Sequence, residues 1–361
     1  MSLVSQKLDI ESRAAEKCQL SSLEPTPTGR PRDAAIDFTK GTLVLFMVLY
    51  HWLNYFVGPQ GQYYNYLRFL TPSFIFISGF MISRIHLSSY ENSGRRLSKR
   101  LIVRGVKLLA LVFLLNALVS FASARFEVRP ATLATFLHNI CWAFIVSNPT
   151  ASEGQKSVAF SMLVPIAYLL ILSAGLVIST KRERYAFRFA LFVLVVAVLF
   201  SYAYGTVSSY LDLLLIGVFG VVVGFVETGQ IALFLSHPYL LIVLYCCYLG
   251  VITVWRVTLP LQVASVILTT ALLYIAGSRK QPGAAWRHTV LLGKYSLLGY
   301  ISQIAVLQGL RKISWLSQHG VGVLLAPLLL GIVLTLMIVE AADFARRKSM
   351  LADRLYRLVF A

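Results

Sequence analysis

A lysine and a histidine lie on one face of the first strongly apolar segment. In the stretch KGTLVLFMVLYH, Lys40 and His51 are eleven residues apart. At about 100° per residue, this spacing is three helical turns plus ~20°, so both side chains point the same way, ~16 Å apart along the axis. Val44 and Val48 lie between them, and Asn54 follows one turn beyond. The pattern predicts an apolar wall with polar ends, like one side of a tunnel.

These residue types suit acyl transfer. A neutral imidazole can take the proton of a hydroxyl as that hydroxyl attacks a thioester, and a cation at the helix end suits the phosphates of an acyl-coenzyme A. The alternative is structural: His51 donates one N–H to a neighbouring helix, and Lys40 extends to lipid phosphates. Because an ionisable group at the depth of His51 is costly in a membrane, the functional interpretation is favoured.

The composition indicates that the solvent around this segment is lipid. The chain is 57% hydrophobic and 13% charged, with a mean hydropathy of +0.72, whereas soluble domains carry about 25% charged residues. The net charge of +18 comes from short clusters between apolar segments. Such clusters are typical of cytoplasmic loops, so the charge does not indicate nucleic-acid binding.

Runs of about 20 apolar residues, the length that spans ~30 Å of hydrocarbon, predict an all-α membrane protein of about ten transmembrane helices. The candidates are 39–57, 67–85, 101–123, 157–179, 186–203, 208–227, 231–255, 257–277, 289–310 and 321–344. With both termini cytoplasmic, only seven of the 33 Lys and Arg residues fall outside, which agrees with the positive-inside rule. The stretch 130–149 is short for a span and is predicted to be an interfacial or re-entrant helix on the outer face.

Polar segments flank the transmembrane domain, which is predicted over 38–345. Residues 1–37 lack the features of a signal peptide and are predicted to be a cytoplasmic tail, and 346–361 a basic cytoplasmic tail. The four cysteines have no metal or redox spacing, so neither a disulfide framework nor a metal site is expected. The small residues of GVFGVVVG, 217–224, predict close helix packing.

Several motifs together resemble the membrane acyltransferase type 3 family and its wider superfamily, which includes periplasmic glucan succinyltransferases and the heparan glucosaminide acetyltransferase. AIDFTKG, ending at Gly41, resembles the family's Asp-x-x-Arg-Gly signature, with Lys40 where arginine is usual. PSFIFISGFMIS (72–83), RRLSKRLIVRGVKLL (95–109) and GKYSLLGYISQ (293–303) are similar to three further family segments. Gln303 stands where family members often have histidine.

The resemblance implies an O-acyltransferase of the plasma (inner) membrane. It would move an acyl group from cytosolic acyl-coenzyme A, used as a co-substrate, to a hydroxyl of an outer carbohydrate or lipid-linked glycan. No permanently bound cofactor is expected. His51 would be the general base, or alternatively the acyl carrier, since imidazole can itself attack a thioester. Asn54 would assist it, and Tyr300 and Gln303 of the late helix would contact substrate.

Cations near the third span are the second candidate element. In the cluster from 95 to 107, Arg100 and Arg104 are one turn apart and can converge on a phosphate, and Arg96 lies one turn earlier. Anchoring to anionic lipid explains the same cluster equally well. The resemblance favours a donor site.

Carboxylates and tyrosines within the spans carry weaker signals. Asp212 hydrogen-bonds to a nearby tyrosine or serine, or else it binds the acceptor sugar or orients His51. Glu340 and Asp343 are expected to pair with nearby arginines. Tyr63, with Tyr64 and Tyr66, forms an interfacial aromatic belt or stacks on a sugar.

Transport is the alternative function. A bundle with an intramembrane histidine and a buried carboxylate could carry a proton relay. Transporters commonly show paired interrupted helices in two related halves. The sequence shows no second copy of the opening segment, so a proton-coupled transporter is the second choice.

Overall fold

The protein is described by a computed structural model in which every defined element is a helix. It describes residues 33–58, 61, 63–87, 94–124, 160–180, 182–205, 208–255, 257–279, 283–312 and 321–360. Residues 1–32 and the predicted re-entrant segment 130–149 lie outside the described residues. Contacts divide the chain into Met1–Ala34 and a much larger unit, Ala35–Ala361, which contains the helices discussed below.

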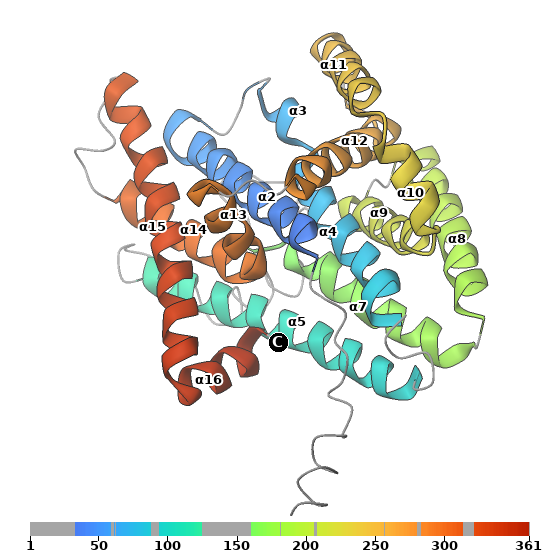
Figure 1. Cartoon of the computed structure of the whole chain (residues 1–361), viewed down its shortest axis with the longest axis horizontal. Coiled ribbons are helices and arrows are strands. Elements are labelled where there is room, and N and C mark those ends of the chain that lie inside the picture. Colours follow the sequence, from blue (N-terminus) through green and yellow to red (C-terminus); the bar gives the residue numbers. More distant parts are fainter. Residues whose placement is uncertain are drawn as a thin grey trace, which may run out of the picture. The chain divides into compact units, whose positions relative to one another are not determined.

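The helices follow one another along the chain as Figure 1 labels them. They are α2 (Ala34–Trp52), the π-helix η1 (Leu53–Val57), α3 (Tyr63–Leu67), α4 (Leu70–Met81), the π-helix η2 (Ile82–Leu87), α5 (Gly94–Ala124), α7 (Leu163–Ser179), α8 (Glu183–Ala203), α9 (Ser209–Gly224), α10 (Thr228–Leu235), α11 (Pro238–Val254), α12 (Leu259–Ser278), α13 (Ala284–Lys294), α14 (Ser296–Arg311), α15 (Val321–Lys348) and α16 (Met350–Phe360).

The lengths and composition of these helices are those of a multi-pass membrane protein. Among the described residues, six helices are long and apolar enough to span a bilayer, or up to eight if each of two bent helix pairs is one span. Two further apolar helices, α7 and α11, have 17 residues each. Ten spans and cytoplasmic termini stay predictions.

Two predicted spans are divided in the structure. The segment near 289–310 consists of α13 and α14, which meet at 97° around Tyr295. The segment 231–255 begins instead with α10, which bends from α9 by 108°, and α11 starts at Pro238. Proline lacks the N–H that a continuous helix would need, so a new helix begins there.

The residue environment of α8 shows where lipid is expected. Only Phe187 and Val198 of its 21 residues are buried, and large apolar side chains such as Phe189 and Phe192 are exposed. Exposed apolar surface of this extent is unfavourable in water and natural in hydrocarbon. The exposed side of α8 therefore faces lipid.

Polar side chains inside the helices bond back to their own backbone. Thr39 donates to the carbonyl of Ala35 at 2.8 Å, and Thr270 donates to that of Val266 at 2.6 Å. Asn116 does the same with Val112 at 2.9 Å. A local acceptor four residues earlier satisfies the hydroxyl or amide without water, which hydrocarbon lacks.

Glycines allow a close helix contact between α4 and α9. A methyl group on Gly79 would lie 2.0 Å from the carbonyl oxygen of Gly217, and one on Gly220 would lie 2.2 Å from that of Phe76. The two backbones therefore touch without side chains between them. The prediction that GVFGVVVG marks close helix packing is confirmed.

Replacing Gly79 tests this contact. Gly79→Ala should lower the free energy of unfolding by about 1 to 3 kcal/mol, because the opposing atom belongs to backbone and cannot turn aside. Gly250→Ala on α11 is the control, since a methyl there meets nothing within 4 Å, and it should be neutral or stabilising by about 0.5 to 1 kcal/mol. Thermal unfolding in one detergent, followed by circular dichroism, compares them. Equal melting curves would contradict the close approach.

Candidate functional site

Lys40 lies at the start of α2 in an ion pair with its own helix. Its Nζ is 2.8 Å from Oδ1 of Asp37, and the two side chains are 12% and 6% exposed. A methyl group on Gly293 of α13 would lie 1.6 Å from the Asp37 carbonyl oxygen, and one on Gly41 would lie 1.9 Å from the carbonyl oxygen of Thr289. The backbone of α13 therefore packs directly on α2 beside this pair. The structural alternative assumed that Lys40 extends to lipid phosphates. In the structure its side chain pairs with Asp37 instead.

The apolar face between Lys40 and His51 is a helix interface. Val44 and Val48 are fully buried. A methyl group on Gly299 of α14 would lie 3.3 Å from Val44, and Val48 packs with Leu307 of the same helix. α14 therefore covers the face that was predicted to line a tunnel.

His51 lies in the last turn of α2 with one ring nitrogen enclosed. Its Nδ1 is buried and has no hydrogen-bond partner in the part of the chain that is described, although the residue as a whole is partly exposed. The ring stacks on Tyr55 with centroids 5.8 Å apart and meets Tyr50 edge-on at 5.3 Å. A buried polar atom without a partner is rare and calls for an explanation, because it costs free energy.

Tyrosine and glutamine side chains from α14 complete the surroundings of α2's outer half. The buried hydroxyl of Tyr300 interacts electrostatically with those of Tyr50 and Tyr55. Gln308 donates from Nε2 to the Tyr55 hydroxyl at 3.4 Å. The structure thus brings Tyr300 to the residues that flank His51, and its substrate role stays a prediction.

Gln303 is a second unsatisfied polar group. The residue is fully buried, and neither atom of its amide has a hydrogen-bond partner among the described residues. It lies one turn from Gly299 and one turn from Leu307, the two positions of α14 that meet Val44 and Val48. Its amide therefore belongs to the face of α14 that packs on α2.

The helix carrying His51 changes its winding immediately afterwards. Residues Leu53–Val57 form a π-helix, closed by the bond from the Gly58 amide to the Leu53 carbonyl at 2.9 Å. π-turns occur frequently at functional sites. Asn54 lies inside this turn, so the regular 100° spacing that predicted it on the face of His51 does not continue to it.

Gly58 ends the π-turn in a conformation that favours glycine, with φ of +149°. Its carbonyl accepts hydrogen bonds from the hydroxyls of Tyr63 at 3.1 Å and Tyr64 at 2.6 Å. Tyr64 also meets Tyr50 edge-on at 5.4 Å. Of the three tyrosines that follow the first helix, Tyr64 therefore meets the ring next to His51.

Arg68 was missed by sequence reasoning. It lies between α3 and α4, and its charge interacts with the hydroxyls of Tyr50 and Tyr248. Its backbone carbonyl accepts from Nε2 of Gln262 at 3.5 Å. A single arginine after a tyrosine-rich stretch gave no sequence signal, because its partners come from α2, α11 and α12.

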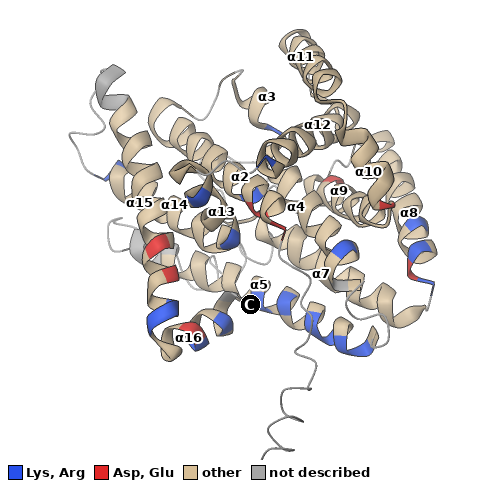
Figure 2. Ribbon diagram, viewed as in Figure 1, with Lys and Arg blue, Asp and Glu red and all other residues tan. Residues whose placement is uncertain are grey.

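The predicted donor cations lie on α5. Arg96 and Arg100 are exposed and Arg104 is partly exposed, and the basic residues of α5 are seen in Figure 2. The opposite side of α5 packs on α7, where Ser98 donates to the Ala174 carbonyl at 3.0 Å. The three arginines share a helix and present charge outward, which fits both donor binding and lipid anchoring.

Asp212 forms the bond that its structural interpretation predicted. It lies in the first turn of α9 and accepts a hydrogen bond from the hydroxyl of Tyr202 on α8 at 3.2 Å. The structure assigns it this partner. A role in acceptor binding stays a prediction.

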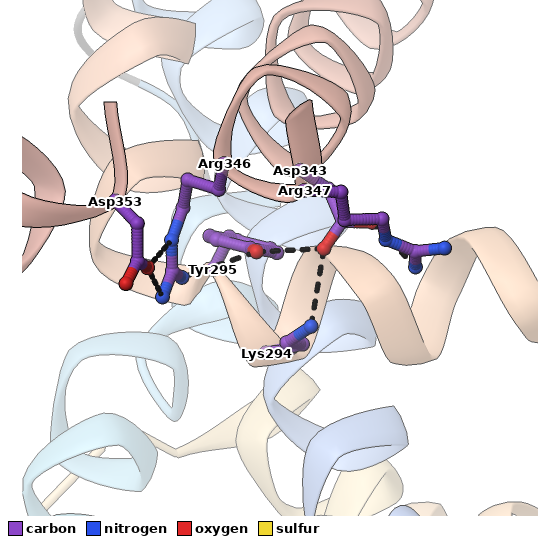
Figure 3. Close-up of polar contacts among 6 residues, drawn as sticks. All are labelled: Lys294, Tyr295, Asp343, Arg346, Arg347 and Asp353. Atoms are coloured by element: carbon purple, nitrogen blue, oxygen red, sulfur yellow. Dashed lines mark hydrogen bonds and ion pairs between the residues drawn. The ribbon is translucent and has the colours of Figure 1, made fainter. Parts of the chain in front are cut away.

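A polar network ties the corner between α13 and α14 to α15 (Figure 3). Asp343 accepts from the Tyr295 hydroxyl at 2.6 Å and from Lys294 Nζ at 3.1 Å, and pairs with Arg347 at 2.6 Å. The expected pairing of Asp343 with an arginine is confirmed. Glu340 pairs instead with His288 of α13 at 2.5 Å.

The described residues contain no set of ligands for a metal ion. No group of three His, Cys, Asp or Glu side chains there could hold a metal ion. Cys246 and Cys247, the two described cysteines, are free thiols on the exposed side of α11.

Comparison with family models, with curated proteins and with solved structures gives no significant match. The acyltransferase resemblance therefore rests on the motifs of this chain alone.

Removing the carboxylate of Asp343 tests the network. Asp343→Asn should lower the free energy of unfolding by about 1 to 3 kcal/mol, since a buried acceptor of three bonds loses its charge. Glu340→Gln, one turn earlier on α15, is the matched control, and loss of its half-exposed pair should cost under ~1 kcal/mol. Thermal unfolding of both variants in detergent measures the difference. A larger loss for Glu340→Gln would refute the assignment.

Proposed function

We propose that the protein is a membrane O-acyltransferase that uses acyl-coenzyme A and acylates a hydroxyl of a carbohydrate or lipid-linked glycan. The observation that carries the proposal is the buried, unpartnered Nδ1 of His51, enclosed by tyrosines on an apolar helix. A buried side-chain polar atom held only for structure has a hydrogen-bond partner in the large majority of cases. One left unsatisfied suits a base that acts when substrate is bound.

The proposed reaction is a single displacement. His51 takes the proton of the acceptor hydroxyl, whose oxygen attacks the thioester carbonyl. The new C–O ester bond forms, the C–S bond breaks, and the thiolate of coenzyme A leaves and takes the proton that His51 had accepted, which restores the neutral imidazole. The hydroxyls of Tyr55 and Tyr300 are donors available for the negative oxygen that develops on the carbonyl.

On the donor side, Lys40 is the proposed phosphate contact. Its charge is neutralised by Asp37 at 2.8 Å, so a phosphate would have to compete with a carboxylate for it. Arg96, Arg100 and Arg104 offer guanidinium groups for the remaining phosphates. Lysine is a point charge without arginine's planar fork, so the contact would be weaker than in family members with arginine.

On the acceptor side, polar groups from several elements support a sugar site. Tyr64 and Arg68 adjoin the ring of Tyr50. Gln303 brings an amide with unused hydrogen-bonding capacity. We place the acceptor at this end of α2, on the outer side of the plasma (inner) membrane, and the donor at the Lys40 end.

Proton-coupled transport is the second candidate, and the two bent helix pairs favour it. Discontinuous helices form the substrate sites of many transporters. The α13–α14 break, however, lies at Lys294 and Tyr295, whose partners are the charged residues Asp343 and Arg346. Such a cluster is typical of the membrane surface, whereas transporter sites lie near the midplane. The acyltransferase proposal is therefore preferred.

Replacing His51 tests the proposed base. His51→Gln should lower acyl transfer about 10²- to 10⁴-fold, because an amide cannot take the hydroxyl proton. Release of thiol from acetyl-, succinyl- and longer acyl-coenzyme A by the purified protein measures it. His237→Gln, at an exposed position before α11, is the control and should keep full activity. Unimpaired turnover by a folded His51→Gln variant would remove the proposed role.

Lys40 variants test donor binding. Lys40→Gln should weaken acyl-coenzyme A binding, whereas Lys40→Arg should retain or improve it, because the planar guanidinium suits phosphate. Calorimetry in detergent at one salt concentration measures donor affinity. Asp37→Asn separates the two roles of the lysine: it breaks the ion pair yet keeps the cation, so donor affinity should be kept or should rise, because the competing carboxylate is gone. Equal affinity for all four proteins would show that the pair is structural only.

A further inference from the structure

α16 is a short helix with two unlike faces. It follows α15 after a single residue, Ser349, whose Oγ accepts from the Ala352 amide at 3.3 Å and caps its first turn. The segment belongs to the stretch predicted as a basic tail. In the structure it is a helix of eleven residues that packs against α15.

Polar bonds hold the inner face of α16 against the protein (Figure 3). Arg346 donates from Nε and Nη2 to Oδ1 of Asp353, at 2.9 and 2.6 Å. Its guanidinium also lies 4.1 Å from the ring centre of Tyr356, which meets Tyr295 edge-on at 5.3 Å. Hydrogen bonds from Arg346 and Arg357 hold the pKa of Asp353 below its usual range. The carboxylate therefore stays charged at neutral pH, and the helix has a fixed orientation.

The far end of α16 is fixed as well. Lys107 of α5 donates to the carbonyl of Arg357 at 3.5 Å. α16 thus runs from α15 toward the helix that carries the basic cluster, and Figure 2 shows Lys and Arg on both α5 and α16.

The outer face of α16 is apolar and open. Leu351 and Leu358 are each 68% exposed, and Leu355 is 56% exposed. Positions 351, 355 and 358 follow the spacing of one helix face. Arg354 borders this strip and is exposed, and its helical angle places it ~60° from Leu351.

The preceding helix, α15, also has exposed apolar side chains. Val333, Met337 and Phe344 of that helix are exposed apolar residues, and Lys348 lies 4.6 Å from the ring centre of Phe344 at its end. Exposed apolar residues are therefore present on a spanning helix and on α16, and cations lie at the junction of the two helices. A helix with leucines on one face and arginines beside them is typical of the membrane interface.

We propose that α16 lies in the plane of the membrane surface, with its leucine strip in the boundary between headgroups and acyl chains and its arginines on anionic phospholipid phosphates. The phosphate contacts are Arg354 and, at the end of α15, Arg347, whose exposed guanidinium also pairs with Asp343. A second copy of the chain fits this face less well, because a symmetric contact would bring the two Arg354 side chains together. The proposal is independent of the catalytic one.

A spin label at position 355 tests the location of the strip. The full chain, with its native cysteines changed to serine and Leu355→Cys labelled, is reconstituted into vesicles of phosphatidylcholine alone or mixed with phosphatidylglycerol. The label should collide with oxygen several-fold more than with a water-soluble nickel chelate, and lie about 5 to 10 Å below the phosphates. A label at Val333→Cys on α15 should lie deeper.

The same spin label at position 355 tests whether the charge of Arg354 contacts anionic lipid. Phosphatidylglycerol should draw position 355 deeper and reduce its mobility, and Arg354→Gln should remove this difference. Arg287→Gln, an exposed cation of α13, is the control and should preserve it. Full access to the nickel chelate would overturn the proposal, as would shielding from both reagents, which would indicate cover by a second copy. An unchanged lipid response in Arg354→Gln would overturn the anionic-lipid contact.

Discussion

Hydrocarbon offers no hydrogen bonds, and this constraint governs every polar group within the helices. Most of the described ones comply: hydroxyls of Thr39 and Thr270 bond back to their own helices, and Asp212 has its tyrosine. His51 Nδ1 and the amide of Gln303 do not comply. They belong to α2 and to the helix packed on it, whereas the other buried side-chain atoms without partners, the hydroxyls of Ser73, Ser173, Tyr248 and Thr269, lie on α4, α7, α11 and α12.

Close backbone contact is what keeps these groups in place. Gly41 and Gly293 let α2 touch α13 without side chains between them, and Gly79 does the same for α4 against α9. At both of these contacts the helix backbones approach closely because glycine has no side chain to separate them. The close packing of α2 on α13 fixes the position of Lys40 beside Asp37. It also fixes His51, three turns later on the same helix. A base held in a fixed orientation is the property that a proton transfer needs.

The sequence predicted the features that follow from regular helical spacing. It did not predict where the helices depart from that spacing. The spacing of Lys40 and His51, the close packing of GVFGVVVG and the ion pair of Asp343 all follow from local pattern and charge. The π-turn after Leu53 and the break at Tyr295 depend on tertiary contacts. The Lys40–Asp37 pair and the contacts of Arg68 also needed coordinates, since several rotamers and partners were open. The leucine spacing of α16 was present in the sequence, within a stretch interpreted as a tail.

The central claim is that His51 acts on a donor from the Lys40 end of α2 and an acceptor from the Tyr64 end. Sealed vesicles with the protein in one orientation test it, because acyl-coenzyme A does not cross the bilayer. Donor is supplied to one side and glycan and glycolipid acceptors to the other. The account predicts thiol release and acylated acceptor only when the donor is on the side of Lys40 and α16. Transfer that is indifferent to side, or absent with every donor while protons drive uptake of a solute, would contradict it.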